Sequence, residues 1–600
     1  MKHLTNERIG YISGLDGLRA IAAMIVVLYH LVPGIAEAGY IGVDMFFVIS
    51  GFLITALLVK EKEARGKISV RSFWVRRIRR LLPAVAVATL GSLALARIFG
   101  GDTLTQLRWQ AIGSLTGTYN WLQISHASSY FDKQSPLLLS NMWSLAVEQQ
   151  FYIVWPPIVI LLLVCTVVEI RIVCALLLGI GSIVLHALTV GADPTSAYVS
   201  TFSHSFGLMF GAALALALPG LLTGSRAGTK AIWGWISWLS LLAIVVLSFI
   251  LTDSHYMYPW GMVAFSILMV GTIRGLLPDA SGFGTRSLRA VLETPPLVWI
   301  GHRSYGIYLW HWPLHVIGFY HSPMAAVPTA LIVLMLSIAL ADVSYRYIET
   351  PIRTHGFLGW LRTMPPLHKK KAAGIVLAAL VTGTAVAGFI TEHATSSGQQ
   401  LIIDAEKQAK EQQSTPAPPP LSEPRDTPEN PKRPVLPNVV GENVTVIGDS
   451  VTVAATPALQ EKLPGIVVNS EVSRSIKQFP TIAAQMAQEN QLRPYVVIAL
   501  GTNGAITEED AQAILNAVGP DRRIVLVTAS APEYATWVPV SNSTMREMAR
   551  KNPDRVVIAD WQSIALAHPD LLAGDQIHPG TEGSALFANE VFQALHRFQK

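Results

Sequence analysis

About eleven apolar segments, each long enough to cross a lipid bilayer, occupy the first 395 residues of this 600-residue chain. A helix needs about 20 mostly apolar residues to cross the hydrocarbon core. The composition agrees, because 51% of the residues are hydrophobic and only 14% are charged. The chain is therefore expected to contain a polytopic α-helical membrane domain. The segments are 15–33, 39–60, 81–99, 145–166, 170–190, 201–219, 232–252, 257–275, 303–320, 327–347 and 373–391.

The positions of the basic residues predict how these segments are oriented. Lys and Arg gather in the cytoplasmic loops of membrane proteins, and the loops 61–80 and 353–372 are rich in both. A twelfth segment, 107–124, contains Arg108 and several amides and is predicted to be re-entrant or surface-lying. The N-terminus is then cytoplasmic and residues 392–600 lie outside. This placement accounts for the net charge of +5, so no nucleic-acid partner is expected.

A proline-rich tract separates the apolar part from the rest of the chain. Nine prolines fall between Pro416 and Pro437, among polar residues. Such a composition cannot bury enough apolar surface to build a core, and proline-rich chain extends by about 3.1 Å per residue. We expect a membrane domain with a final anchoring span at 1–395, a linker at 396–439 and a separate domain at 440–600.

The last 160 or so residues read as an α/β domain. Buried strands are predicted at 443–447, 495–500, 524–528 and 556–559, with helical stretches between them. Strands that alternate with helices form a parallel sheet covered on both faces. Functional side chains in such folds lie beyond the carboxyl ends of the strands.

Three short motifs in this domain favour acyl-transfer chemistry. Ser450 follows the first strand in a Gly-Asp-Ser sequence, Asn503 follows a later strand, and Asp575 precedes His578 by three residues. A serine hydroxyl needs a base to take its proton, a histidine needs a partner that fixes its tautomer, and an oxyanion needs preset donors. His578 is the predicted base, Asp575 its partner and Asn503 an oxyanion donor. Each motif alone is more often a strand-to-helix turn or a surface loop, but the three in this order within one domain favour function.

Several ionisable residues lie within the predicted spans. Arg19 and His30 are eleven positions apart, which places them on one helix face and about 16 Å apart along the axis. By the predicted topology His30, Asp44 and Glu148 come to a similar depth near the outer side, and His311 lies near the middle of its span. A histidine with two carboxylates predicts acid–base work in a cavity. The alternative is a set of paired polar groups that only hold the bundle together.

The membrane part resembles the acyltransferase-3 family over roughly residues 10–355. The resemblance implies that acetyl-CoA, or another acyl-CoA, is used at the cytoplasmic face and that the acyl group passes outward. It also implies that Arg19 and His30 are essential, with His30 as base or relay near the thioester. The motifs that carry it are Arg19-x10-His30, GVDMFFVISGF, the basic segment Arg76–Arg80, WSLAVEQQFY and SYGIYLWHWP.

The same resemblance implies an arginine site for the phosphates of CoA, since guanidinium forks suit phosphate. One position departs from the family pattern, because His204 stands where an arginine is usual. Its role is left open. The predicted CoA-binding residues are Arg19, Arg76, Arg77, Arg79 and Arg80.

Residues from about 440 to 600 resemble the SGNH hydrolase and acetyltransferase superfamily. Ser450, Asn503, Asp575 and His578 match its motif positions directly. The second oxyanion position of that superfamily is often glycine, and here it is Ser473. The resemblance implies an SGNH-hydrolase-like fold and an external acyl-transfer site.

The whole chain resembles the peptidoglycan O-acetyltransferases of Gram-positive bacteria. The resemblance implies a multi-pass plasma-membrane enzyme that moves acetyl groups from cytoplasmic acetyl-CoA to cell-wall glycan. The expected acceptor is the C6 hydroxyl of N-acetylmuramic acid, reached through an acetyl ester on Ser450, and the product would resist lysozyme. The expected partners are the glycan and membrane lipid. No metal is expected, and Cys165 and Cys174 indicate neither a disulfide framework nor a zinc site.

Three alternatives remain open from the sequence. The closest is the same chemistry on another envelope polysaccharide or glycolipid. The second is an external carbohydrate esterase, against which the fused CoA-type membrane part argues. The third is a transporter or sensor with a head that only binds glycan, against which the complete set of Ser450, Asp575 and His578 argues.

Overall fold

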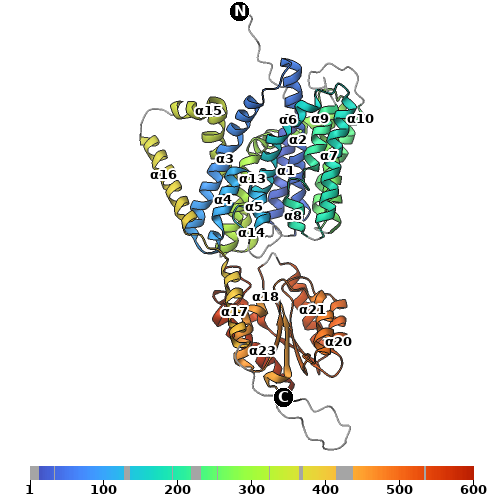
Figure 1. Cartoon of the computed structure of the whole chain (residues 1–600), viewed down its shortest axis with the longest axis vertical. Coiled ribbons are helices and arrows are strands. Elements are labelled where there is room, and N and C mark those ends of the chain that lie inside the picture. Colours follow the sequence, from blue (N-terminus) through green and yellow to red (C-terminus); the bar gives the residue numbers. More distant parts are fainter. Residues whose placement is uncertain are drawn as a thin grey trace, which may run out of the picture. The chain divides into compact units, whose positions relative to one another are not determined.

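The computed structural model describes residues 12–599 apart from 33, 127–135, 192, 218–230, 253–254, 323, 364–368, 414–436 and 533–534. The chain forms two compact units, Met1–Ala394 and Thr395–Lys600. The first is helical (Figure 1), and the second contains a parallel sheet.

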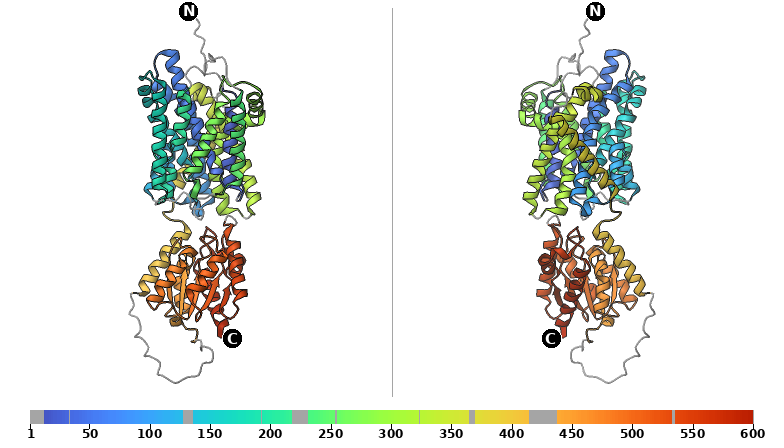
Figure 2. Two further views of the ribbon diagram at one scale, coloured as in Figure 1. Left: turned by 90° about the vertical axis from the view of Figure 1, so that its right-hand side faces the viewer. Right: turned by 90° about the vertical axis from the view of Figure 1, so that its left-hand side faces the viewer.

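A helix forms on each of the eleven predicted apolar segments. The two side views in Figure 2 show them running alongside one another as a bundle. Their bounds are α1 (Leu15–Leu31), α2 (Gly42–Arg65), α3 (Val70–Phe99), α6 (Met142–Leu162), α7 (Val168–Thr189), α9 (Phe206–Ala217), α10 (Ile232–Ile250), α11 (Trp260–Arg274), α13 (Pro295–His321), α14 (Ala326–Ser344) and α16 (Lys369–Ile390).

Among the described residues, six helical stretches are long and apolar enough to cross a membrane. Three further apolar helices are shorter, at 10–17 residues. Helices of the first unit therefore have the length and composition of membrane spans, while the count of about eleven stays a prediction. The six stretches are Gly39–Arg65, Val70–Phe99, Met142–Leu162, Val168–Thr189, Ile232–Ile250 and Ala326–Trp360.

The polar segment 107–124 does not form one continuous helix. It folds as α4 (Leu107–Thr116) and α5 (Tyr119–Ser125), which are separated by Gly117 in the left-handed region at φ 70°. Each is too short to span a bilayer. Arg108 pairs with Glu392 at 3.1 Å and donates to backbone carbonyls at the end of α16. The remaining helices of this unit are α8 (Pro194–Val199), α12 (Phe283–Leu292) and α15 (Thr350–Thr363).

Glycines let the central helices approach at backbone distance. A Cβ added at Gly51 of α2 would lie 1.9 Å from the carbonyl oxygen of Leu208 in α9, and one at Gly211 would lie 2.1 Å from that of Val48. Small residues at such positions are a general device for packing helices in lipid, where burial of apolar side chains gives little driving force. The polar side chains of α2 are thereby held in fixed places.

The second unit contains a five-stranded parallel sheet in the order β2-β1-β3-β4-β5. The prediction of a parallel sheet is confirmed, and four of the strands fall on the predicted segments. The edge strand β2 was not predicted, because its half-buried residues lack the long apolar run of the others. The bounds are β1 (Val444–Gly448), β2 (Val467–Ser470), β3 (Tyr495–Ala499), β4 (Arg523–Val527) and β5 (Val556–Ala559).

Helices cover both faces of this sheet (Figure 1). Alternate residues of β3 enter two cores: Tyr495 and Val497 pack with residues of α18 and α23, whereas Val496 and Ile498 pack with residues of α19, α20 and α21. Every residue of β3 is therefore buried, as expected for a strand covered on both sides. The helices are α18 (Ser450–Lys462), α19 (Phe479–Gln488), α20 (Glu508–Val518), α21 (Trp537–Lys551), α22 (Trp561–Ala567) and α23 (Thr581–His596).

The structure differs from the sequence prediction at the start of the predicted linker. Residues Ser397–Gln413 form a helix, α17, and the second compact unit begins at Thr395 rather than at 440. The helix packs on α18, and its Ala405 is buried. The proline tract starts only at Pro416, so nothing in this stretch prevents a helix. Residues 414–436, which hold most of the tract, lie outside the described residues.

Candidate active sites

Ser450, His578 and Asp575 form a hydrogen-bonded chain at the carboxyl end of the sheet. Ser450 is the first residue of α18 and lies two positions beyond the end of β1, while the other two precede α23. The Oγ of Ser450 lies 2.8 Å from Nε2 of His578, and Nδ1 of His578 lies 2.7 Å from Oδ2 of Asp575. All three are at most 5% exposed. The structure thus brings Ser450 together with a pair of residues that lies more than a hundred positions further along the chain.

The loop before α23 fixes which histidine nitrogen carries the proton. The backbone N–H groups of Ile577 and His578 donate to Oδ1 of Asp575 at 2.9 and 3.1 Å. The other carboxylate oxygen accepts from Nδ1–H of His578, so Nε2 of the neutral ring holds a lone pair. That lone pair faces the Ser450 hydroxyl. This is the arrangement in which an imidazole activates a serine.

The two predicted oxyanion residues lie in loops after β2 and β3. Ser473 adopts φ 62°, in the left-handed region that favours glycine, so the backbone here suits the glycine that the resemblance leads us to expect at this position. Asn503 donates from Nδ2 to the carbonyl of Arg474 at 3.3 Å. Arg474, which the sequence did not single out, is buried and donates to the carbonyls of Gly448 and Asn469. The roles of Ser473 and Asn503 stay predictions.

Asp449 is a buried carboxylate directly before the serine. Its Oδ1 accepts from the N–H of Val451 at 3.0 Å and so caps α18. Burial raises the pKa of Asp449 to about 6, and hydrogen bonds to the carboxylate limit the rise.

Helix α17, which precedes the proline tract in the sequence, contacts the Asp575–His578 pair. A Cβ added at Gly398 would lie 2.1 Å from Oδ2 of Asp575 and 3.1 Å from Nδ1 of His578. Next to it, Oγ of Ser397 accepts from the N–H of Gly574 at 2.9 Å. Gly398 therefore helps to seal the hydrogen bond between the two side chains. No sequence pattern indicates this contact, because a glycine ahead of a linker has many explanations.

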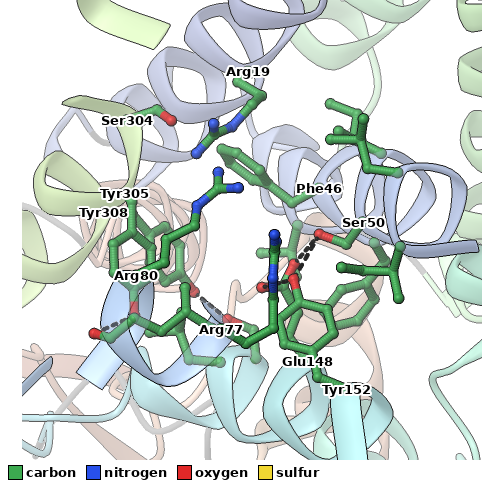
Figure 3. Close-up of a pocket in the computed structure, with 18 residues that line it drawn as sticks. Arg19, Phe46, Ser50, Arg77, Arg80, Glu148, Tyr152, Ser304, Tyr305 and Tyr308 are labelled. Atoms are coloured by element: carbon green, nitrogen blue, oxygen red, sulfur yellow. Dashed lines mark hydrogen bonds between the residues drawn. The ribbon is translucent and has the colours of Figure 1, made fainter. Parts of the chain in front are cut away.

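The first unit contains a cavity into which three guanidinium groups point (Figure 3). Its empty volume is about 770 Å³, including space open to solvent. Arg19 comes from α1, and Arg77 and Arg80 come from α3. Glu148 of α6 is the carboxylate in the lining. The other polar lining residues are Ser50, Ser144, Tyr152, Ser304, Tyr305 and Tyr308.

Only part of the predicted arginine cluster lines this cavity. Arg77 and Arg80 are three positions apart and share one face of α3. Arg76 lies on another face and pairs with Glu61 at 3.2 Å, and the guanidinium of Arg79 lies close to Gly356. The expectation that all four arginines of the segment Arg76–Arg80 contribute to one site is therefore not met. A continuous helix turns successive side chains to different sides.

His30, Asp44 and Glu148, predicted as one acid–base group, have contacts in three separate places. Glu148 accepts from Ser50 at 2.6 Å and from Tyr152 at 3.2 Å (Figure 3). Asp44 lies 3.0 Å from Nε2 of His204, with both side chains fully buried. This contact gives His204, whose role the sequence left open, a place in the structure.

His30 instead meets a histidine of another helix. Its Nδ1 lies 3.0 Å from Nε2 of His311 in α13. The sequence placed His311 in the middle of its span but did not predict this pairing.

Comparison with known proteins decides the family. A family model described as an acyltransferase domain, Acyl_transf_3, matches residues 12–346, more than half of the chain. The chain belongs to the acyltransferase-3 family. The family predicted from the membrane motifs is confirmed.

Two curated relatives match the chain from end to end. The putative peptidoglycan O-acetyltransferase YrhL of Bacillus subtilis is 31% identical over 99% of this chain and 100% of its own length. The peptidoglycan O-acetyltransferase OatA of Listeria monocytogenes is 30% identical over 100% of both chains. This acyltransferase-3 protein is an O-acyltransferase enzyme, with a membrane part and a hydrolase-like part in one chain.

A solved structure is also similar to the second unit. It is the C-terminal catalytic domain of Streptococcus pneumoniae peptidoglycan O-acetyltransferase A with a methylsulfonyl adduct. It is 33% identical, covers 27% of this chain and 96% of its own, and has a TM-score of 0.25.

The contact at Gly398 predicts that Gly398→Ala slows acyl transfer by the second unit. The added methyl group must displace Asp575 or α17, and a misplacement of about 1 Å in a catalytic group costs roughly 100-fold in rate. The measurement is turnover of an activated acetyl ester by the full chain. Glu406→Ala, on the exposed side of the same helix, is the control and should leave the rate unchanged. Wild-type turnover by Gly398→Ala would show that α17 does not dock on the working enzyme.

The buried carboxylate of Asp449 predicts a pH-dependent stability. Its pKa rises from 3.8 to about 6 on folding, so the folded state holds a proton that the unfolded state has lost. The favourable contribution of the protonated carboxyl group to the free energy of unfolding is complete below about pH 4. It is lost as the pH rises through about 6, and the loss amounts to about 3 kcal/mol. Asp449→Asn, which keeps the cap oxygen, should therefore gain stability relative to wild type between pH 4 and 7. Urea unfolding of residues 395–600 measures this, and a difference that stays constant with pH would contradict it.

Proposed function

We propose that the enzyme takes acetyl groups from acetyl-CoA at the cytoplasmic face, passes them through its membrane unit, and places them on peptidoglycan outside. The acceptor is the C6 hydroxyl of N-acetylmuramic acid, and Ser450 carries the group as an ester before the final transfer. The observation that carries the proposal is that one chain holds both a guanidinium-lined cavity among apolar helices and a hydrogen-bonded Ser450–His578–Asp575 chain.

The cavity suits the phosphate groups of CoA. Arg19, Arg77 and Arg80 face it with Glu148 as the carboxylate of its lining, and the carboxylate is already engaged by Ser50 and Tyr152. The cavity therefore carries a net excess of positive charge. Guanidinium groups bind phosphate oxygens in paired hydrogen bonds, which a lysine cannot reproduce.

The position of His30 fits a long donor molecule. Arg19 and His30 lie on the same helix, eleven residues or about 16 Å apart along its axis. A CoA held by its phosphates at Arg19 would extend its flexible arm toward His30. The thioester carbonyl would then lie within reach of the histidine pair, and the proposed entry side is the one that bears the basic loop 61–80.

The second unit completes the transfer in two steps. The membrane unit delivers the acetyl group as an oxygen ester on a carrier hydroxyl. Nε2 of His578 takes the proton of Ser450 as the serine oxygen attacks the carbonyl of that ester; the new C–O bond to Ser450 forms and the bond to the carrier oxygen breaks. His578 returns the proton to that leaving oxygen. A sugar hydroxyl then attacks the Ser450 ester, with His578 taking its proton and restoring it to Ser450. Water as acceptor would make the same site an esterase.

The choice of acceptor rests on the relatives. Both end-to-end relatives carry peptidoglycan O-acetyltransferase in their names. Another envelope polysaccharide or glycolipid remains the second candidate, since the same chemistry serves any accessible hydroxyl.

The proposal is tested by acetyl transfer to glycan. The 600-residue chain in liposomes, supplied with acetyl-CoA and muramic-acid-containing glycan oligomers, should yield glycan heavier by one acetyl group per site. Ser450→Ala should reduce this product by at least about 1,000-fold, because the nucleophile is lost. Acetate release that glycan does not affect would instead indicate an esterase. Acetylated glycan from Ser450→Ala would refute the proposed ester.

The cavity predicts a difference between neighbouring arginines. Arg80→Ala should weaken CoA binding by about tenfold or more, since a charge-assisted contact is worth about 1.5–3 kcal/mol. Arg76→Ala should change the affinity by less than about threefold, because its guanidinium pairs with Glu61 near the surface. Calorimetric titration of the purified protein with CoA measures both. Equal losses for the two variants would place the phosphate site elsewhere.

A further inference from the structure

A pair of histidines connects α1 with α13 inside the first unit. Nδ1 of His30 lies 3.0 Å from Nε2 of His311, and the two rings stack with centroids 5.2 Å apart. His311 is fully buried. The two residues are 281 positions apart, so this contact depends entirely on how the bundle packs.

The backbone decides which nitrogen of His311 carries hydrogen. Nδ1 of His311 lies 2.7 Å from the carbonyl oxygen of Tyr308. A carbonyl oxygen only accepts, so Nδ1 must be the donor. In the neutral imidazole the other nitrogen, Nε2, then holds a lone pair and accepts. The hydrogen bond between the rings therefore runs from Nδ1–H of His30 to Nε2 of His311.

The direction of that bond fixes the state of His30 as well. With its hydrogen on Nδ1, a neutral His30 has its lone pair on Nε2. His311 therefore acts on His30 as Asp575 acts on His578: each accepts a hydrogen bond from Nδ1–H of its partner. In the first pair the acceptor is a neutral imidazole, and in the second it is a carboxylate. In both cases an acceptor at Nδ1 leaves Nε2 as the basic nitrogen.

The carbonyl at the start of this chain is itself held in place. Nδ2 of Asn141 donates to the same Tyr308 oxygen at 2.7 Å, and the Tyr308 hydroxyl lies 2.7 Å from Oγ of Ser144. Ser144 and Tyr308 also line the guanidinium cavity. The histidine pair is therefore coupled by direct contacts to the wall of the proposed CoA site.

We propose that His311 is a positioning residue for acyl transfer in the membrane unit, which holds His30 in the tautomer and orientation of a general base. The inference rests on the proposed use of an acyl thioester. As an acceptor hydroxyl attacks the thioester carbonyl, Nε2 of His30 takes the hydroxyl proton. The new C–O bond forms, the C–S bond breaks, and the thiolate leaves with the proton from Nε2. The Nδ1–H bond to His311 persists throughout.

A purely structural role for His311 makes a different prediction. If the pair only holds α1 against α13, then any side chain of similar volume should serve. If His311 supplies an acceptor to His30, then glutamine should serve, because its amide oxygen can reach the position of Nε2. Asparagine, whose amide ends near the position of Nδ1, should not.

The test measures release of CoA thiol from acetyl-CoA by the full chain in nanodiscs, with muramic-acid-containing glycan oligomers present as the final acceptor. His311→Leu should lower kcat 10- to 100-fold, the range typical of groups that orient a functional histidine through its second nitrogen. KM for acetyl-CoA should stay within about twofold of wild type, because the arginines of the cavity are untouched. His311→Gln should recover most of the rate and His311→Asn should not. His321→Leu, at the end of the same helix, is the control and should behave as wild type, because its ring contacts Phe99 rather than the histidine pair.

Each outcome decides the inference. Wild-type kcat in His311→Leu, or equal rates for His311→Gln and His311→Asn, would overturn it and leave a packing role. The comparison of glutamine with asparagine still decides if the leucine variant fails to fold. A wild-type enzyme that releases no CoA from acetyl-CoA would instead refute the proposed donor, which distinguishes that failure from failure of the His311 assignment.

Discussion

In the proposed mechanism, acyl transfer depends on the hydrogen-bonded chain from Asp575 through His578 to Ser450. The fold restricts these three side chains to one arrangement. Two backbone N–H groups hold one oxygen of Asp575, Gly398 closes over the other, and the strand-to-helix turn after β1 presents the serine. Each of these contacts lowers the number of orientations open to His578, and a base with one orientation needs no reorganisation when the reaction starts.

Ionisable side chains in the first unit are also held in fixed orientations by their partners, and here their surroundings are mostly apolar. Ionisable groups among apolar helices are costly unless they face a cavity or a partner. Arg19, Arg77 and Arg80 face a cavity, Asp44 meets His204, and His30 meets His311. Two different uses of histidine follow from this packing. His204 pairs with a carboxylate and is fully enclosed, whereas His30 is linked through His311 and Tyr308 to the wall of the cavity. This difference is why we assign transfer to His30.

The helices of the first unit, the parallel sheet and the Ser450 site could be predicted from the sequence, because each depends on a pattern that is local in the chain. The apolar segments are long local patterns, and the strand, Gly-Asp-Ser and late Asp-x-x-His order fixes positions at one end of a parallel sheet. What could not be predicted depends on packing between distant segments. The face of α3 that meets the cavity separates Arg77 and Arg80 from Arg76 and Arg79, and helix periodicity alone does not say which pair points inward. The partners of His30 and of Gly398 lie 281 and about 177 positions away.

The central claim is that an acetyl group from a thioester on one side reaches Ser450. The most direct test supplies acetyl-CoA, labelled in its acetyl group, only to the face of sealed proteoliposomes that exposes the loop 61–80, with no glycan present. The account predicts the label as an ester on the peptide that contains Ser450, detected by mass spectrometry, and its loss when muramic-acid-containing glycan is added. Labelled glycan formed at full rate while the Ser450 peptide never carries the label would contradict it.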